Sequence, residues 1–144
     1  MKIKEIIYTA AVIQYETLGQ DLIEERFFTH PIRYAHHCTI QFGNVEVIPE
    51  FVGKEVNFIA NNFFNDNNAS AFDGYIDDIE IQELMKNSKQ HAHITLSCEH
   101  GIKPVYSNTL VRVTKPVEKI NGLVIPCKIG VYCSFYEGKP DWIF

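Results

Sequence analysis

The feature of this chain that most constrains its fold is the tripeptide His-x-Thr, which occurs twice, each time inside a short apolar run. His37 and Thr39 lie in HHCTIQF, and His93 and Thr95 lie in HAHITLS. Residues i and i+2 of a β-strand point to the same face. Each run therefore predicts a strand that presents an imidazole and a hydroxyl on one surface. Two such strands facing one cleft would bring four polar side chains together.

The elements around the two motifs indicate an α+β fold in a single domain over residues 1–144, a length that suits one domain. Apolar runs predict strands over 6–14, 33–43, 55–75 (a pair around an Asn-rich turn at 65–68), 88–99 and 123–136. Helical spacing predicts a helix over 18–28 capped by Thr17, and a second helix that begins at Ser107. Residues 76–86 fit either a strand or a short helix. The order of these elements suggests two similar lobes with a cleft between them.

Two imidazoles and two hydroxyls around one cleft suit the cleavage of a phosphodiester. One histidine would take a proton from the attacking oxygen, and the other would protonate the leaving oxygen. Thr39 and Thr95 would hold the nonbridging oxygens and stabilise their charge in the transition state. A histidine pKa of about 6.5 allows one ring to be neutral and the other charged near neutral pH. The sequence does not settle whether His37 or His93 is the base.

The other histidines have no threonine two residues further on. His36 adjoins His37, so strand alternation predicts that it points to the opposite face. His91 lies two residues before the second motif and could reach the rim of the cleft. His30 and His100 are expected on the surface. No His-x-x-x-His or Cys-x-x-Cys spacing is present, so we expect neither a metal nor another cofactor.

The net charge and the hydropathy of the chain restrict the kinds of ligand and partner that it is expected to bind. The net charge is −5 and no Lys/Arg cluster is present, whereas proteins that grip long nucleic acids usually present a basic surface. A nucleotide ligand would therefore be small and held in a pocket. No apolar stretch approaches the roughly 18 residues that span a bilayer, and Glu5 interrupts the N-terminal apolar run, which is expected to be a strand and not a signal peptide. The four cysteines lie in strand-like runs and are expected to be buried thiols of a cytoplasmic protein.

The two motifs resemble those of the two-histidine (2H) phosphoesterase superfamily, in which His-hydrophobic-Thr is followed by an apolar residue. Cys38 and Ile94 occupy the variable position, and Ile40 and Leu96 occupy the position after the threonine. Within that superfamily, the segment 34–42 and the later HAHITLS and KPVYSN are most similar to phage-encoded anti-CBASS nucleases. Those enzymes destroy the cyclic oligonucleotide messengers of bacterial defence.

The resemblance implies a two-lobed, pseudo-symmetric fold with antiparallel sheets around a central cleft and flanking helices. It also implies metal-independent hydrolysis of 3′,5′ bonds in a cyclic di- or trinucleotide, as a phage counter-defence in the host cytoplasm. The residues it implies are the catalytic His37, Thr39, His93 and Thr95, and the substrate-binding Tyr8, Glu137 and Trp142.

Two other functions fit the same residues. A 2′,3′-cyclic phosphodiesterase acting on RNA ends would use the same four side chains, but the acidic net charge argues against it. A sponge that sequesters a cyclic nucleotide without cleaving it would use the aromatic and hydroxyl groups, but it has no need of two histidines as proton carriers. The sequence predicts neither the base preference, nor the product, nor the oligomeric state.

Overall fold

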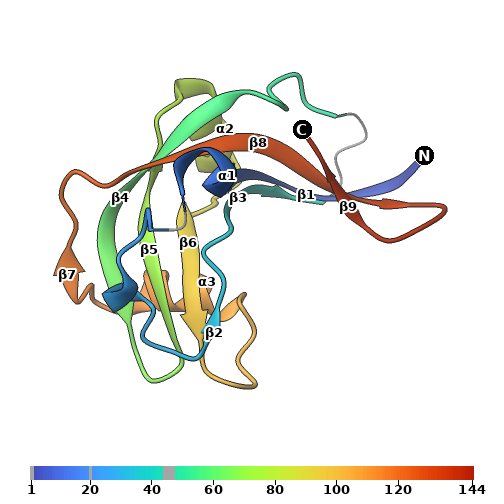
Figure 1. Ribbon diagram of the computed structural model, residues 1–144. Helices are drawn as coiled ribbons and strands as arrows, with labels where there is room; N and C mark the ends of the chain where they lie inside the picture. The colour runs from blue at the N-terminus through green and yellow to red at the C-terminus, as the bar shows by residue number, and fades with distance from the viewer. Residues whose placement is uncertain (1, 20, 44–47) are drawn as a thin grey trace.

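The computed structural model describes residues 2–19, 21–43 and 48–144, in which the strands form one antiparallel sheet that curls round on itself (Figure 1). Strand β4 pairs with β5 on one side and with β8 on the other, so six strands form a closed ring in the order β4-β5-β6-β3-β1-β8. The ring strands are β1 (Ile3–Ile13), β3 (His37–Phe42), β4 (Glu55–Asn65), β5 (Ala69–Ile76), β6 (His93–Cys98) and β8 (Val124–Phe135). Three short strands extend it: β2 (Ile32–Arg33) on β6, β7 (Glu118–Lys119) on β4 and β9 (Asp141–Ile143) on β8.

The interior of the ring is filled by alternate residues of its strands. Cys38 and Ile40 of β3 and Ile94 and Leu96 of β6 have no solvent exposure and belong to the main core. A small closed sheet leaves an interior just wide enough for such side chains to fill. The alternation predicted for both motif strands is therefore confirmed, and the motif histidines and threonines lie on the outer face.

The predicted strand pair at 55–75 is also confirmed. Strands β4 and β5 are antiparallel neighbours joined at the Asn-rich turn. The carboxylate of Asp66 accepts hydrogen bonds from the backbone N–H groups of Asn68 and Ala69, at 2.8 and 3.0 Å. This is the turn geometry that Asp and Asn favour, because their side chains substitute for a backbone acceptor.

Two longer helices pack on opposite faces of the sheet. Helix α2 (Ile79–Asn87) adds Ile81 and Met85 to the core inside the ring, which resolves the ambiguity of residues 76–86 in favour of a short helix. Helix α3 (Tyr106–Val113) buries Leu110 and Val111 against β5 and the end of β4. The second helix was correctly predicted, but Ser107 lies inside its first turn, and the capping position is occupied by Val105.

The helix predicted over 18–28 is wrong. Helix α1 (Tyr15–Leu18) ends at Gly19, whose φ of 88° lies in the left-handed region that glycine adopts without strain. Thr17 lies within this helix and cannot cap it. A single 3-10 turn, η1 (Glu25–Phe27), follows. Leu22, Ile23 and Phe27, which contributed to the helical spacing, pack in or against the core without forming an α-helix.

All four cysteines are buried and unpaired, as predicted, and burial raises the pKa of the Cys38 and Cys127 thiols to about 12. None of the helices described is long and apolar enough to cross a membrane. The α+β class with a large antiparallel sheet is confirmed. The finer expectation of two pseudo-symmetric lobes stays a prediction.

Candidate functional site: two His-x-Thr strands around one pocket

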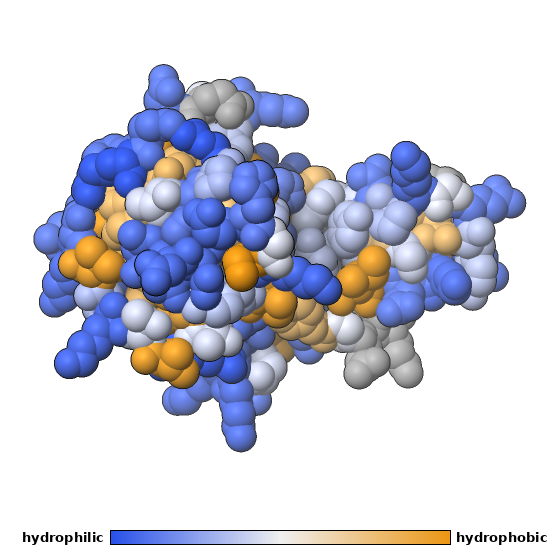
Figure 2. All heavy atoms as spheres, turned by 90° about the horizontal axis from the view of Figure 1, so that it is seen from below, coloured by the Kyte–Doolittle hydropathy of each residue, from blue (hydrophilic) through white to orange (hydrophobic). Residues whose placement is uncertain are grey.

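The four motif residues line one pocket of about 380 Å³ on the outer face of the ring. Strands β3 and β6 are direct neighbours, with Cys38 paired to Ile94 at the centre of both motifs. The pocket is completed by residues of β1 and of the segment that leads into α3. On the lower face of the molecule, apolar side chains gather where the arm made by β1, β8 and β9 leaves the body (Figure 2).

A bulge just before β3 shapes this pocket. The Ala35 N–H donates to the carbonyl of Thr95 at 2.8 Å, whereas the next ladder pair joins Cys38 to Ile94. The move from Thr95 to Ile94 is one residue along β6, whereas the move from Ala35 to Cys38 is three residues along the opposite segment. Two extra residues therefore lie between Ala35 and Cys38. Ala35 has a φ of 47°, a conformation that is uncommon outside glycine and marks a sharp local turn of the chain.

The bulge corrects the expectation for His36. Strand alternation predicts that His36 faces away from His37, and this is wrong because His36 precedes the strand and lines the same pocket. The Nδ1 atoms of the two rings lie 2.9 Å apart, and the ring planes are at 84°. The bulge is held by Ile13, whose N–H donates to the His36 carbonyl, and by Tyr15, whose hydroxyl donates to the Ala35 carbonyl.

The second motif histidine is held in one tautomer. The Nδ1 atom of His93 lies 2.8 Å from the backbone carbonyl oxygen of His91. A carbonyl can only accept, so Nδ1 carries the hydrogen and Nε2 of the neutral ring carries the lone pair. Burial lowers the pKa of His93 below its ordinary 6.5, and the charge of Arg112 acts in the same direction. His93 is therefore a neutral ring with a free acceptor nitrogen at pH 7.

The first motif histidine is neutral as well. Burial, together with the neighbouring His36 and His93, lowers the pKa of His37 to about 4. The ring of Tyr8 stacks on it, with centroids 5.2 Å apart and planes at 28°. No lysine or arginine is among the described residues that line the pocket, although the charge of Arg112 acts on His93.

The two threonines differ in their hydrogen bonding. Thr95 Oγ1 lies 2.6 Å from Ser107 Oγ, and the Ser107 hydroxyl also lies 2.8 Å from the Pro104 carbonyl, to which it can donate. The Thr39 hydroxyl makes no hydrogen bond with any residue that the structure describes, and it is free for a ligand. Ser107 was missed as a site residue, because its place at a helix start suggested a capping role.

The three expected substrate-binding residues fall into different places. Tyr8 lines the pocket. Trp142 lies on β9, and its ring packs against those of Tyr8, His36 and His37 at centroid distances of 5.5, 5.6 and 5.8 Å. It thus supports the two histidines from the side. Glu137 is exposed in the loop between β8 and β9 and is not among the residues that line the pocket.

Two aromatic residues at the pocket were not anticipated. Tyr34 lies before the bulge and Phe42 ends β3, so they flank the first motif along the chain. They are 39% and 56% exposed, so their rings are accessible to a ligand in the pocket. Their positions on either side of the motif are visible in the sequence. The two backbone irregularities are not: the bulge before Cys38 lies next to Tyr34, and a register shift between Thr39 and Gln41 precedes Phe42.

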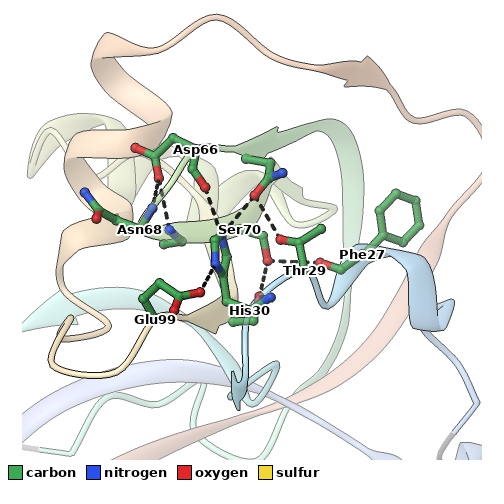
Figure 3. A network of polar contacts seen from close by, with 10 residues as sticks. Phe27, Thr29, His30, Asp66, Asn68, Ser70 and Glu99 are labelled. Atoms are coloured by element: carbon green, nitrogen blue, oxygen red, sulfur yellow. Dashed lines mark hydrogen bonds and ion pairs between the residues drawn. The ribbon is translucent and has the colours of Figure 1, made fainter.

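His30 is not at the surface as predicted, but at the centre of a second polar cluster (Figure 3). Its side chain is 8% exposed, with Nδ1 2.6 Å from a Glu99 oxygen and Nε2 2.9 Å from the Asp66 carbonyl and 3.1 Å from Asn65 Oδ1. Burial opposes a charged ring, but these acceptors outweigh it, so the pKa of His30 lies above 6.5. His100 is exposed, as predicted.

His91 does not line the pocket, because its Nε2 bonds to Asp73 at 3.1 Å. Among the described residues, no group of three or more His, Cys, Asp or Glu side chains is placed to hold a metal ion.

Comparison of the chain with protein-family models, curated proteins and solved structures gave no match.

Proposed function

We propose that this protein is a metal-independent phosphodiesterase of the 2H type that hydrolyses 3′,5′ bonds of small cyclic oligonucleotides. The observation that carries the proposal is the convergence of both His-x-Thr motifs on one pocket of about 380 Å³. General acid–base catalysis at a phosphodiester needs a base on the side of the attacking oxygen and an acid on the side of the leaving oxygen. Imidazoles on two neighbouring strands can meet that requirement.

The hydrogen bonding favours His93 as the base. Its Nδ1 is occupied by a backbone carbonyl, so the neutral ring offers Nε2 to the proton of a 2′-hydroxyl or a water. The bond from that oxygen to phosphorus forms as the bond to the 5′-oxygen breaks, and His37 gives its proton to the 5′-oxygen. The free hydroxyl of Thr39 would donate to a nonbridging oxygen, where charge develops. The hydroxyl of Thr95 would donate to the other after it turns from Ser107 to the ligand.

The lining of the pocket favours a diester between two bases. A phosphodiester carries one negative charge, which a pocket without lysine or arginine can hold through histidines and hydroxyls. The exposed rings of Tyr34 and Phe42 offer stacking surfaces on either side, and such contacts are worth roughly 1–3 kcal/mol per base. The cyclic substrate, the host cytoplasm and the phage counter-defence role come from the resemblance of the motifs to anti-CBASS nucleases.

The test is chromatography of cyclic di- and trinucleotides incubated with the protein in excess EDTA. We expect cleavage that the chelator does not diminish, and a fall of about 10²–10⁴-fold in the single-turnover rate for His37→Ala and for His93→Ala. Calorimetry should show that both variants still bind. His100→Ala is the matched control, since that ring is exposed and outside the pocket.

Each other outcome would support a different function or mechanism. Binding without cleavage would make the protein a sponge, an alternative that is consistent with two uncharged histidines in the free pocket. Cleavage of RNA 2′,3′-cyclic ends alone would change the substrate. Loss of activity in EDTA, restored by one divalent ion, would refute the metal-free mechanism.

A further inference from the structure

We propose that His36 is a positioning residue for His37, which fixes its tautomer and passes a proton to it during the reaction. This inference rests on the proposed function, because it names the origin of the proton that the leaving oxygen receives. His36 lies outside the His-x-Thr pattern, and it reaches the pocket through the bulge before β3.

The contact between the two rings demands a shared proton. Their Nδ1 atoms are 2.9 Å apart, which is hydrogen-bond distance. Two bare lone pairs would repel each other at this distance, and two N–H groups would clash. One Nδ1 therefore carries hydrogen and the other accepts, so the tautomer of each ring dictates that of its neighbour.

The direction of this hydrogen bond follows from the role of His93. His93 is held as the acceptor by the carbonyl of His91, so the acid must be His37. An acid needs hydrogen on the nitrogen that faces the leaving oxygen. With Nε2–H on His37, its Nδ1 is the acceptor, and His36 is the donor.

The proton balance requires one extra proton on the pair. Before the reaction His36 carries hydrogen on both nitrogens, and His37 carries hydrogen on Nε2 only. The Nε2 proton of His37 moves to the leaving 5′-oxygen, and the Nδ1 proton of His36 moves to Nδ1 of His37. Both rings end neutral. The starting state is restored when Nε2 of His37 takes a proton from water and the Nδ1 proton of His37 returns to Nδ1 of His36. His93 meanwhile holds the proton of the attacking oxygen and returns it to water.

The negative charge of the bound ligand stabilises this extra proton on the His36–His37 pair. The titratable groups that face the pair are the phenols of Tyr8 on β1 and Tyr34 before the bulge, and the ring of His93 on β6; β9 contributes the indole of Trp142, which does not titrate. No carboxylate is among the described residues that line the pocket. Desolvation lowers the pKa of both rings in the free protein. A bound phosphodiester supplies the missing negative charge, so binding should take up a proton.

The first test needs no catalytic activity. ¹⁵N NMR of the free protein should show His37 with hydrogen on Nε2 and a bare, hydrogen-bonded Nδ1. Dimethyl phosphate, a phosphodiester without bases, should then protonate the pair in wild type, at a pH where the free protein has both rings neutral. In His36→Phe the fixed tautomer of His37 and the proton uptake should both disappear. A His37 tautomer that is the same with and without the His36 ring would overturn the proposal, even if the protein proves to be an enzyme.

The second test is kinetic. We expect His36→Phe to lower kcat by about 10- to 100-fold, as does the loss of a partner that orients a metal-bound imidazole, with little change in KM. The acidic side of the pH–rate profile should also move. His36→Asn keeps an N–H donor for Nδ1 but cannot pass on a proton, so it should restore the tautomer and not the rate. His100→Phe is the control. An unchanged pH profile and rate in His36→Phe would overturn the proton-passing role, and an inactive wild type with the NMR result intact would overturn the proposed function alone.

Discussion

Replacing His30 by glutamine should make the protein less stable in a pH-dependent way. The imidazole is nearly buried and bonded at both nitrogens to acceptors, so it binds its proton more tightly in the folded protein than in the unfolded chain. A glutamine can still donate to the Asp66 carbonyl, but it cannot carry a charge toward Glu99. The substitution therefore removes the charge-assisted part of the cluster and leaves most of its shape.

The magnitude follows from the kind of hydrogen bond that is lost. Hydrogen bonds to charged groups contribute about 1.5–3 kcal/mol to stability. Since the Glu99 side chain is 44% exposed, solvent screens the pair, and we expect the lower part of that range, about 1.5–2 kcal/mol. For a chain of this length the melting temperature should fall by about 5–8 °C.

The pH dependence has a definite sign. A histidine with a raised folded-state pKa stabilises the protein fully below its unfolded pKa of about 6.5, and this stabilisation is lost as the pH rises through the folded-state value. Urea unfolding at about pH 5.5 and at about pH 8.5 should therefore show a wider gap between wild type and variant at the lower pH. His100→Gln, a neighbouring exposed histidine, should show no such gap. A gap that is equal at both pH values, or wider at high pH, would refute the charged cluster.

Two further changes test the contact of Trp142 with the histidines and the packing of the closed sheet. Trp142→Ala should lower the turnover of bound substrate as well as the affinity, because the indole packs against His37 and supports it. Stopped-flow rates and calorimetric binding measure the two effects separately. A loss confined to affinity would mean that the indole only stacks on a base of the ligand. Gly74→Ala should cost about 3 kcal/mol or more in urea unfolding, because the new Cβ would lie 1.9 Å from the carbonyl oxygen of Ile59 in the paired strand. An alanine variant as stable as wild type would mean that β4 and β5 separate easily at this point.

Much of the site could be predicted from the sequence because strand alternation is a local property. His37 and Thr39 share a face whatever the rest of the chain does, and the same holds for His93 and Thr95. That the two motif strands are neighbours depends on the pairing of distant segments, which no local pattern contains. The sequence therefore predicted the four motif side chains of the pocket, but it could not predict the shape of the pocket.

The errors have a common physical origin in irregular backbone. His36 was misplaced because two extra residues interrupt the ladder after Ala35, and nothing in the sequence of that segment announces a positive φ at an alanine. His30 was misplaced because its acceptors come from the β4–β5 turn and from Glu99, far away in the chain. The helix over 18–28 was wrong because Gly19, at the start of that range, ends α1, and only a 3-10 turn forms further along.

The position of β9 in the sheet has a consequence for the lifetimes of the pocket's parts. The motif strands β3 and β6 are part of the closed ring, so each pairs with a strand on both sides. Strand β9 has only three residues and pairs with β8 alone. Backbone amides of the ring strands should exchange with deuterium only when the whole domain unfolds, and those of β9 should exchange through brief local openings. Each opening would draw the indole of Trp142 away from His36 and His37. The two motif strands thus keep their places during a local opening of β9, while the contact of the indole with the two histidines is lost and formed again.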